Sequence, residues 1–157
     1  MLVIILSYNY NMRKPWYIEI KATKFLYWYS KFTGTHGGAK MAAFYPFIFT
    51  TSEIHPNMRP YFINHELIHF AQQLETLFFF NWLWMSIESG YYTGFKNMTL
   101  FETYVIHASE QEAYDNMFNL EYLQSRKHFS QFRKYIKNKP VIWTEYLDKK
   151  QKIEESI

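Results

Sequence analysis

Hydrophobic side chains in residues 60–80 recur with the period of an α-helix. Leu67, Ile68, Phe70 and Leu74 are among the apolar positions that surround a narrow polar stripe. This spacing of three to four residues predicts a helix. Because a helix that is apolar around most of its circumference is buried, we expect its polar side chains to have partners inside the protein.

Two stretches before residue 60 have the pattern of β-strands. Residues 16–24 partly alternate apolar and polar positions, and residues 41–51 are rich in aromatic and β-branched side chains. Pro46 restricts the second stretch to an edge strand or a bulge. An edge strand can hold an extended peptide by backbone hydrogen bonds. Residues 47–49 are therefore a candidate for substrate binding, with a plain core strand as the favoured alternative.

Two further stretches before the predicted helix are less regular. Residues 25–29 fit a strand or a helix equally well. Residues 34–38 contain three glycines, which predict a loop.

A more hydrophobic stretch follows the predicted helix. Residues 76–87 are mostly apolar, but a membrane-spanning helix needs about 20 such residues. We interpret the stretch, in order of preference, as a buried helix, as a hydrophobic hairpin that covers a site, or as a segment in a membrane interface. Residues 89–94 contain two glycines and are expected to form a loop.

Two capping-box patterns mark helix starts in the last third of the chain. Thr99 to Glu102 and Ser109 to Glu112 each have the S/T-x-x-E form. They predict helices over residues 99–107 and 110–126. We predict another helix over residues 129–138, which Pro140 ends. Residues 143–155 are predicted to form a terminal helix or a frayed tail.

Composition narrows the class of protein. The 157 residues are 48% hydrophobic and 20% charged, which is typical of a globular chain that forms one domain. The net charge of +3 is scattered, so we expect no nucleic-acid partner. There is no cysteine, which leaves His, Asp and Glu as the metal-binding set.

Composition does not decide whether the protein contacts a membrane or where it is located. The aromatic content of 22% suits cores, binding clefts and membrane interfaces alike, so contact with a membrane surface stays open. No signal peptide or transmembrane helix is evident, and we expect a cytoplasmic location. Met12 is a second plausible start, so residues 1–11 are expected to be dispensable.

One motif in the predicted helix has a definite chemistry. Residues 65–69 read H-E-x-x-H, and positions four apart on a helix lie one above the other, so His65 and His69 present two imidazoles to one point. Glu66 lies between them, where it can reach a metal-held water as a general base. Gln73, four residues after His69, is a candidate hydrogen-bond partner behind the ligands. The alternative is a surface helix that merely contains two histidines.

A catalytic zinc site needs a third protein ligand. The candidates after the motif are Glu75, Glu88, Glu102, His107, Glu110, Glu112 and Glu121. Glu110 shares a predicted helix face with Ala113 and Tyr114, whereas Glu112 points about 200° away and is expected to cap the helix. His107 is a possible ligand or oxyanion donor, or simply a residue that makes a local hydrogen bond.

The two motifs together resemble gluzincin-type metallopeptidases, in which H-E-x-x-H is followed by a glutamate in an E-x-x-A pattern. Residues 110–113 match that pattern, which implies that Glu110 is the third ligand, with Glu112 as second choice. The chain also resembles small bacterial proteins that carry N-H-E-x-I-H-x-x-Q-Q and later E-x-E-A-Y. Tyr114 stands where the peptidases commonly have a small polar residue, a departure that bears on peptidase activity more than on metal binding.

These resemblances imply a fold and a function. The fold is a single zincin-like domain over residues 1–157, α+β and mostly α, with a small N-terminal sheet packed on the motif helix. The function is that of a Zn²⁺-dependent peptidase that acts on a peptide or protein substrate. Two other readings remain: a non-catalytic module in which the same ligands hold a structural zinc, and an aromatic-rich membrane-surface protein without metal.

Overall fold

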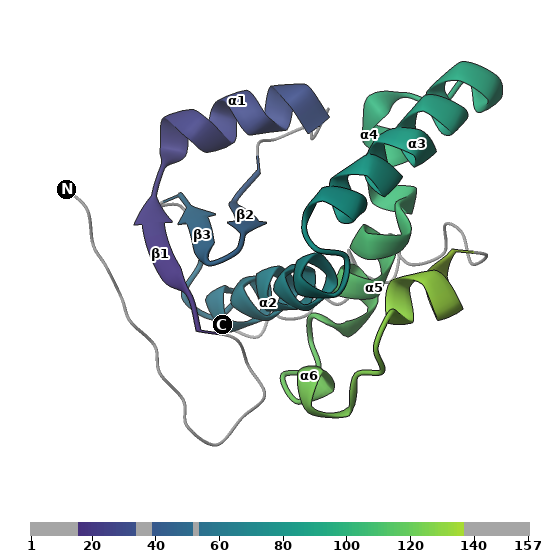
Figure 1. Cartoon of the computed structure of the whole chain (residues 1–157). Helices are drawn as coiled ribbons and strands as arrows, with labels where there is room; N and C mark the ends of the chain where they lie inside the picture. The colour runs from purple at the N-terminus through teal and green to yellow at the C-terminus, as the bar shows by residue number, and fades with distance from the viewer. Residues whose placement is uncertain (1–15, 34–38, 52–53, 137–157) are drawn as a thin grey trace.

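The computed structural model describes residues 16–33, 39–51 and 54–136 (Figure 1). The predictions for residues 1–11, 34–38 and 143–155 lie outside the described residues. The described chain forms strand β1 (Ile18–Lys21), helix α1 (Thr23–Thr33), strands β2 (Met41–Phe44) and β3 (Phe47–Thr50), helices α2 (Arg59–Glu75), α3 (Phe79–Lys96), α4 (Leu100–Ile106), α5 (Ala108–Asn116) and α6 (Tyr122–Ser125), and a π-helical turn η1 (Gln131–Tyr135). The predicted class, α+β and mostly α, is confirmed.

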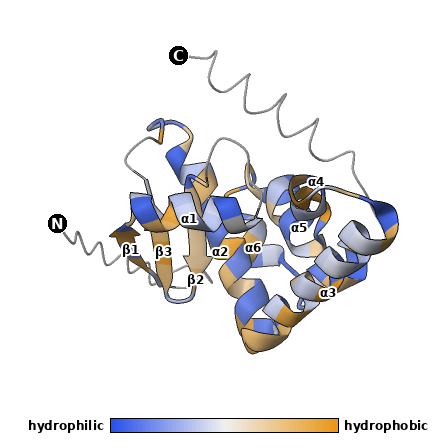
Figure 2. Cartoon of the chain, turned by 90° about the horizontal axis from the view of Figure 1, so that it is seen from above, coloured by the Kyte–Doolittle hydropathy of each residue, from blue (hydrophilic) through white to orange (hydrophobic). Residues whose placement is uncertain are grey.

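The strands form one small sheet in the order β1-β3-β2 (Figure 2). β1 pairs with β3 in parallel, and β2 pairs with β3 as an antiparallel hairpin that turns at Tyr45-Pro46. Residues 41–51 are therefore two strands, because Pro46 fits a turn better than a hydrogen-bonded ladder. β3 has partners on both sides, so residues 47–49 form the core strand that was the favoured alternative, and the candidate free edge there is wrong. The edge strands are β1 and β2.

The sheet is covered on its two faces by α1 and α2 (Figure 1). Residues 25–29, which fitted strand or helix, lie in α1. The core joins the sheet to α2 and α5 through buried Ile48, Ile68, Phe70 and Ala113. The small sheet is thus packed on the motif helix, as the sequence predicted.

The motif helix begins and ends with identifiable signals. Pro60 occupies the first turn of α2, where its missing N–H costs nothing. The helix ends at Glu75, five residues before the predicted boundary, because Leu77 and Phe78 have positive φ angles of 50° and 58°. Such residues in the left-handed region interrupt a right-handed helix.

α3 differs from the prediction in length and in burial. It continues to Lys96 through Gly90 and Gly94, so the loop predicted for residues 89–94 is wrong. Within α3 only Asn81 and Glu88 are buried, which contradicts the preferred interpretation of residues 76–87 as a buried helix. No helix of the described chain is long and apolar enough to cross a membrane.

The two capping boxes have different outcomes. At the start of α4, Thr99 N–H donates to Glu102 Oε2 over 2.8 Å and Glu102 N–H donates to Thr99 Oγ1 over 3.2 Å, as predicted. At α5 the prediction is wrong, because the helix already begins at Ala108 and has no side-chain cap. Ser109 and Glu112 are instead buried within it.

The predicted helix over residues 110–126 is interrupted. α5 ends at Asn116, where Asn64 Nδ2 from α2 donates to the carbonyl oxygens of Asn116, Met117 and Asn119 over 3.3, 2.9 and 3.0 Å. Asn116 O and Asn119 O also accept the backbone N–H groups of Asn119 and Tyr122, both over 3.0 Å. A single side chain of the motif helix therefore ties α2 to the end of the second site helix.

Candidate metal centre

His65 and His69 of α2 and Glu110 of α5 bring their side chains to one point. The two Nε2 atoms lie 3.0 Å apart, and the carboxylate oxygens of Glu110 lie 3.4 Å from His65 Nε2 and 3.4 Å from His69 Nε2. Donor atoms about 2.1 Å from a tetrahedral zinc ion lie about 3.4 Å from one another. The triangle of donors therefore has the size that one such ion requires, and all three side chains are buried.

Burial leaves polar atoms of this cluster without partners. Glu110 Oε2 and His65 Nδ1 make no hydrogen bond within the described chain. A buried, unpaired carboxylate oxygen is costly because it has lost its water. A cation placed among the three donors would supply the missing partner to Glu110.

The charges of the cluster are coupled. Burial by itself raises the pKa of Glu110, but the charge of His69 and the proximity of both imidazoles outweigh it and lower that pKa below its ordinary value. Burial lowers the pKa of His69, yet the carboxylate of Glu110 raises it to about 9. Burial lowers the pKa of His65. A proton on His69 thus balances Glu110 in the metal-free protein, and a metal ion would take its place.

Gln72 fixes the tautomer of His69. Its Nε2 donates to Ser109 O over 3.0 Å and to Glu112 Oε2 over 2.9 Å, which sets the amide orientation. Gln72 Oε1 therefore faces His69 Nδ1, 2.8 Å away, and accepts its N–H. The lone pair of neutral His69 then resides on Nε2, which faces the other donors, as in most histidine ligands.

The partner expected from the sequence was Gln73, which has another role. Gln73 Nε2 donates to Ala43 O over 2.8 Å, and Gln73 Oε1 accepts from Tyr45 N–H over 2.9 Å. Gln73 thus holds the β2–β3 hairpin against α2. The only sequence signal for Gln72 is that it belongs to a pair of adjacent glutamines. The pair alone does not reveal which glutamine faces the histidine.

Glu112, the second-choice ligand, is not one of the three clustered donors and bonds instead to Gln72 and Arg126. It is fully buried, and its Oε1 accepts from Arg126 Nε over 2.7 Å and from the Tyr122 hydroxyl over 2.8 Å. Arg126 also contacts Glu75 Oε1 over 2.6 Å. The charge of Glu112 is therefore compensated away from the histidines.

His107 is engaged with α3. Its Nδ1 lies 2.9 Å from Glu88 Oε2, and its Nε2 lies 3.1 Å from Ser89 Oγ. This order of groups is that of a Ser-His-acid triad, but Ser89 lies in the middle of α3, where backbone N–H groups are used by the helix and none can form an oxyanion hole. His107 therefore links α3 to the corner between α4 and α5.

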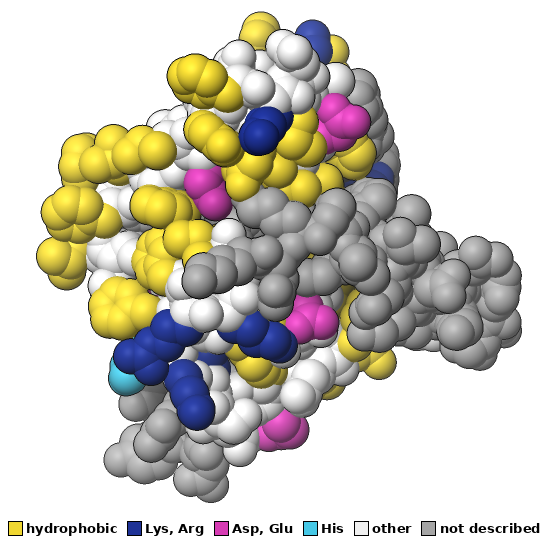
Figure 3. Space-filling view, turned by 90° about the vertical axis from the view of Figure 1, so that its right-hand side faces the viewer, with side chains coloured by type: hydrophobic (Ala, Val, Ile, Leu, Met, Phe, Trp, Pro, Cys, Tyr) yellow, Lys and Arg dark blue, Asp and Glu magenta, His cyan; other side chains and the backbone are white. Residues whose placement is uncertain are grey.

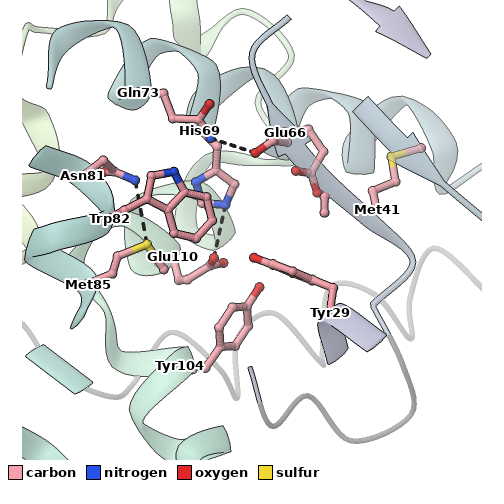
Figure 4. A pocket seen from close by; sticks show the side chains of 12 residues that line it. Tyr29, Met41, Glu66, His69, Gln73, Asn81, Trp82, Met85, Tyr104 and Glu110 are labelled. Atoms are coloured by element: carbon pink, nitrogen blue, oxygen red, sulfur yellow. Dashed lines mark hydrogen bonds and ion pairs between the residues drawn. The ribbon is translucent and has the colours of Figure 1, made fainter. Parts of the chain in front are cut away.

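Glu66 lies beside the three donors on the wall of a cavity of about 30 Å³. Figure 4 shows the hydroxyls of Tyr29 and Tyr104 pointing into the same space, toward Glu110. Burial raises the pKa of Glu66 to about 8, and burial together with the charges of Glu110 and Glu66 raises the pKa of Tyr29. No sequence motif marked either tyrosine, because they come from α1 and α4, far from residues 65–69.

Two more features adjoin the centre. The ring of Tyr114 contacts that of His65, with the centroids 4.6 Å apart. A wider apolar hollow of about 460 Å³ shares two of its residues with the small cavity. It is lined by Phe25, Tyr29, Phe44, Phe49 and Trp82.

Comparison of the chain with protein-family models, with curated proteins and with solved structures gave no match in any of the three.

Proposed function

We propose that the protein is a zinc-dependent hydrolase of peptide bonds, related to the gluzincin-type metallopeptidases. His65, His69 and Glu110 would hold the ion, and Glu66 would act as general base. One observation carries the proposal: three buried donors lie at zinc spacing, and two of them, His69 and Glu110, line the same small cavity as the non-ligating carboxylate of Glu66. Peptidase sites of the H-E-x-x-H type need this combination.

The donor set fits zinc rather than a hard cation. Two imidazoles and one carboxylate suit Zn²⁺, whereas Ca²⁺ and Mg²⁺ prefer oxygen ligands alone. Within the described residues no fourth His, Asp or Glu joins the cluster. Three protein ligands with an adjoining cavity are typical of a catalytic site, because a structural site closes its fourth position with protein.

In the proposed hydrolysis, Glu66 transfers a proton, and Tyr29 and Tyr104 stabilise developing charge. When bound, zinc supplies a Lewis acid that activates water near neutral pH and polarises a carbonyl oxygen. Glu66 takes the proton of the attacking water at a carboxylate oxygen and passes it to the amine nitrogen that leaves. Glu66 must be ionised for this step, and its buried carboxyl would lose its proton more readily beside a bound cation. Tyr29 and Tyr104 donate hydrogen bonds to the carbonyl oxygen as charge develops on it.

A peptide substrate has two places to bind. The edge strand β2 offers backbone groups on the side not paired with β3, apart from Ala43 O, which accepts from Gln73. The apolar hollow beside the cavity offers room for a hydrophobic side chain.

A second candidate function is a structural zinc that joins α2 to α5. It is favoured by the size of the cavity, because about 30 Å³ holds only one or two water molecules. Tyr29, Tyr104 and Trp82 line this space, so a peptide reaches the centre only if these side chains move.

Glu66→Gln distinguishes the two functions. The substitution preserves shape and removes basicity. A peptidase variant of this kind keeps its zinc and its melting temperature but loses cleavage of a mixed peptide library by about 10² to 10⁴. Glu88→Gln, which removes a buried carboxylate outside the centre, retains cleavage. If zinc-loaded wild-type protein cleaves nothing in the library, the structural function is supported and the peptidase proposal fails.

A further inference from the structure

α3 exposes an apolar face to solvent along its whole length. We define the α3 stripe as Leu77, Phe80, Leu83, Ile87, Tyr91 and Phe95, which are 72%, 56%, 42%, 55%, 48% and 79% exposed. At 100° per residue, the five positions from Phe80 to Phe95 fall within about 120° of the helix circumference. Large apolar side chains exposed together on one face mark an interaction surface.

The stripe continues onto a neighbouring segment. Phe129 and Phe132, near the start of η1, close a groove of about 390 Å³ together with Leu77, Phe80 and Ile87. Phe129 has a positive φ of 55° and is 42% exposed. Figure 3 shows several groups of hydrophobic side chains exposed on this side of the molecule.

Basic side chains border the stripe and the groove. Lys127 and Arg133 flank the two phenylalanines in sequence and are exposed, and Lys96 lies at the other end of α3 beside Phe95. In the described part of the chain, neither Lys127 nor Arg133 forms an ion pair. Figure 3 shows Lys and Arg side chains gathered beside exposed hydrophobic side chains.

Two acidic residues beside the stripe, Glu75 and Glu88, make bonds within the protein, whereas Glu102 at the start of α4 is exposed. Glu75 bonds to Arg126, to His128 and to the backbone N–H of Phe129. Glu88 is 7% exposed and bonds to His107. The border therefore presents positive charge to an incoming surface.

We propose that the α3 stripe docks in the headgroup region of an anionic phospholipid membrane, with Lys96, Lys127 and Arg133 on lipid phosphates. An apolar face bordered by Lys and Arg is the pattern of helices that lie in a membrane interface. A second copy of the chain fits less well, because a two-fold contact through the stripe brings basic borders close to each other. The helix lies on the bilayer, since the face about 90° around the helix from the stripe holds the buried Asn81 and Glu88.

Flotation of the full-length protein with lipid vesicles tests the apolar part of this proposal. The protein should bind vesicles of phosphatidylcholine with about one third phosphatidylserine. Phe80→Ser combined with Ile87→Ser should weaken binding at least tenfold and leave zinc content and circular dichroism unchanged. Trp28→Ser, at a position on α1 that is 70% exposed, should bind like wild type. Equal losses from the control and the stripe variant would overturn the assignment.

The basic border has its own test. Lys127→Gln with Arg133→Gln should weaken binding to the anionic vesicles by about 25-fold, fivefold for each charge. Lys21→Gln with Lys24→Gln, two exposed lysines near α1, should have a much smaller effect. Equally strong binding of the wild-type protein to vesicles of pure phosphatidylcholine would refute the proposal. So would a second result: wild-type protein that does not bind vesicles but sediments as a dimer, with the dimer lost in the stripe variant. These readouts do not depend on hydrolase activity.

Discussion

Gln72 turns its amide oxygen to His69 Nδ1 at 2.8 Å and gives both amide hydrogens to α5, through Ser109 O and Glu112 Oε2. One side chain thus orients a candidate ligand and joins the two helices that supply the donors. The candidate centre and the α2–α5 interface are consequently coupled through Gln72.

Gln72→Leu should lower zinc affinity by about 10- to 100-fold, because His69 loses the acceptor that sets its tautomer. Gln73→Leu is the matched control. It removes bonds to Ala43 and Tyr45, so it should lower the free energy of unfolding by about 1–3 kcal/mol and leave zinc affinity nearly unchanged. Competition with a chromogenic chelator measures the affinities. A larger loss of affinity in Gln73→Leu would assign the orienting role to Gln73.

Glu110→Gln and Glu112→Gln should have opposite consequences. Glu110→Gln removes a donor from the centre, so zinc should be lost on dialysis. Glu112→Gln leaves the donors in place but uncouples a buried pair with Arg126, and should cost about 3 kcal/mol of stability. Zinc content after dialysis and urea unfolding distinguish the two variants. Retention of zinc by Glu110→Gln together with its loss from Glu112→Gln would transfer the ligand role.

Zinc affinity should rise with pH. The pKa of His69 is raised to about 9 by Glu110, so below that pH the metal must displace a proton from this imidazole. Between about pH 6.5 and 9, each unit of pH should therefore strengthen binding about tenfold. Calorimetry in buffers with different ionisation enthalpies counts the protons released at pH 7.5. If zinc binding releases no protons and its affinity does not change with pH, His69 is not protonated in the metal-free protein.

Local features of the fold were predictable from the sequence. Residues four apart on a helix must share a face, so the pairing of His65 with His69 needed only the helix itself. The capping box at Thr99 is likewise local, because both of its bonds lie within four residues.

Features that depend on tertiary packing were not predictable. The choice between Gln72 and Gln73 depends on how α2 faces the sheet and α5. The apolar stretch over residues 76–87 predicts burial from composition, yet most of its large side chains are exposed because few elements cover α3. Gly90 and Gly94 are tolerated inside this helix, since two glycines weaken a helix by only about 1 kcal/mol each.

Elemental analysis of purified protein tests the central claim most directly. Wild-type protein should carry about one zinc ion per chain, and His65→Ala or His69→Ala should remove it. His55→Ala, at an exposed position outside the centre, should retain the same zinc content as wild type. Wild-type protein that stays metal-free after refolding with excess zinc would contradict the account.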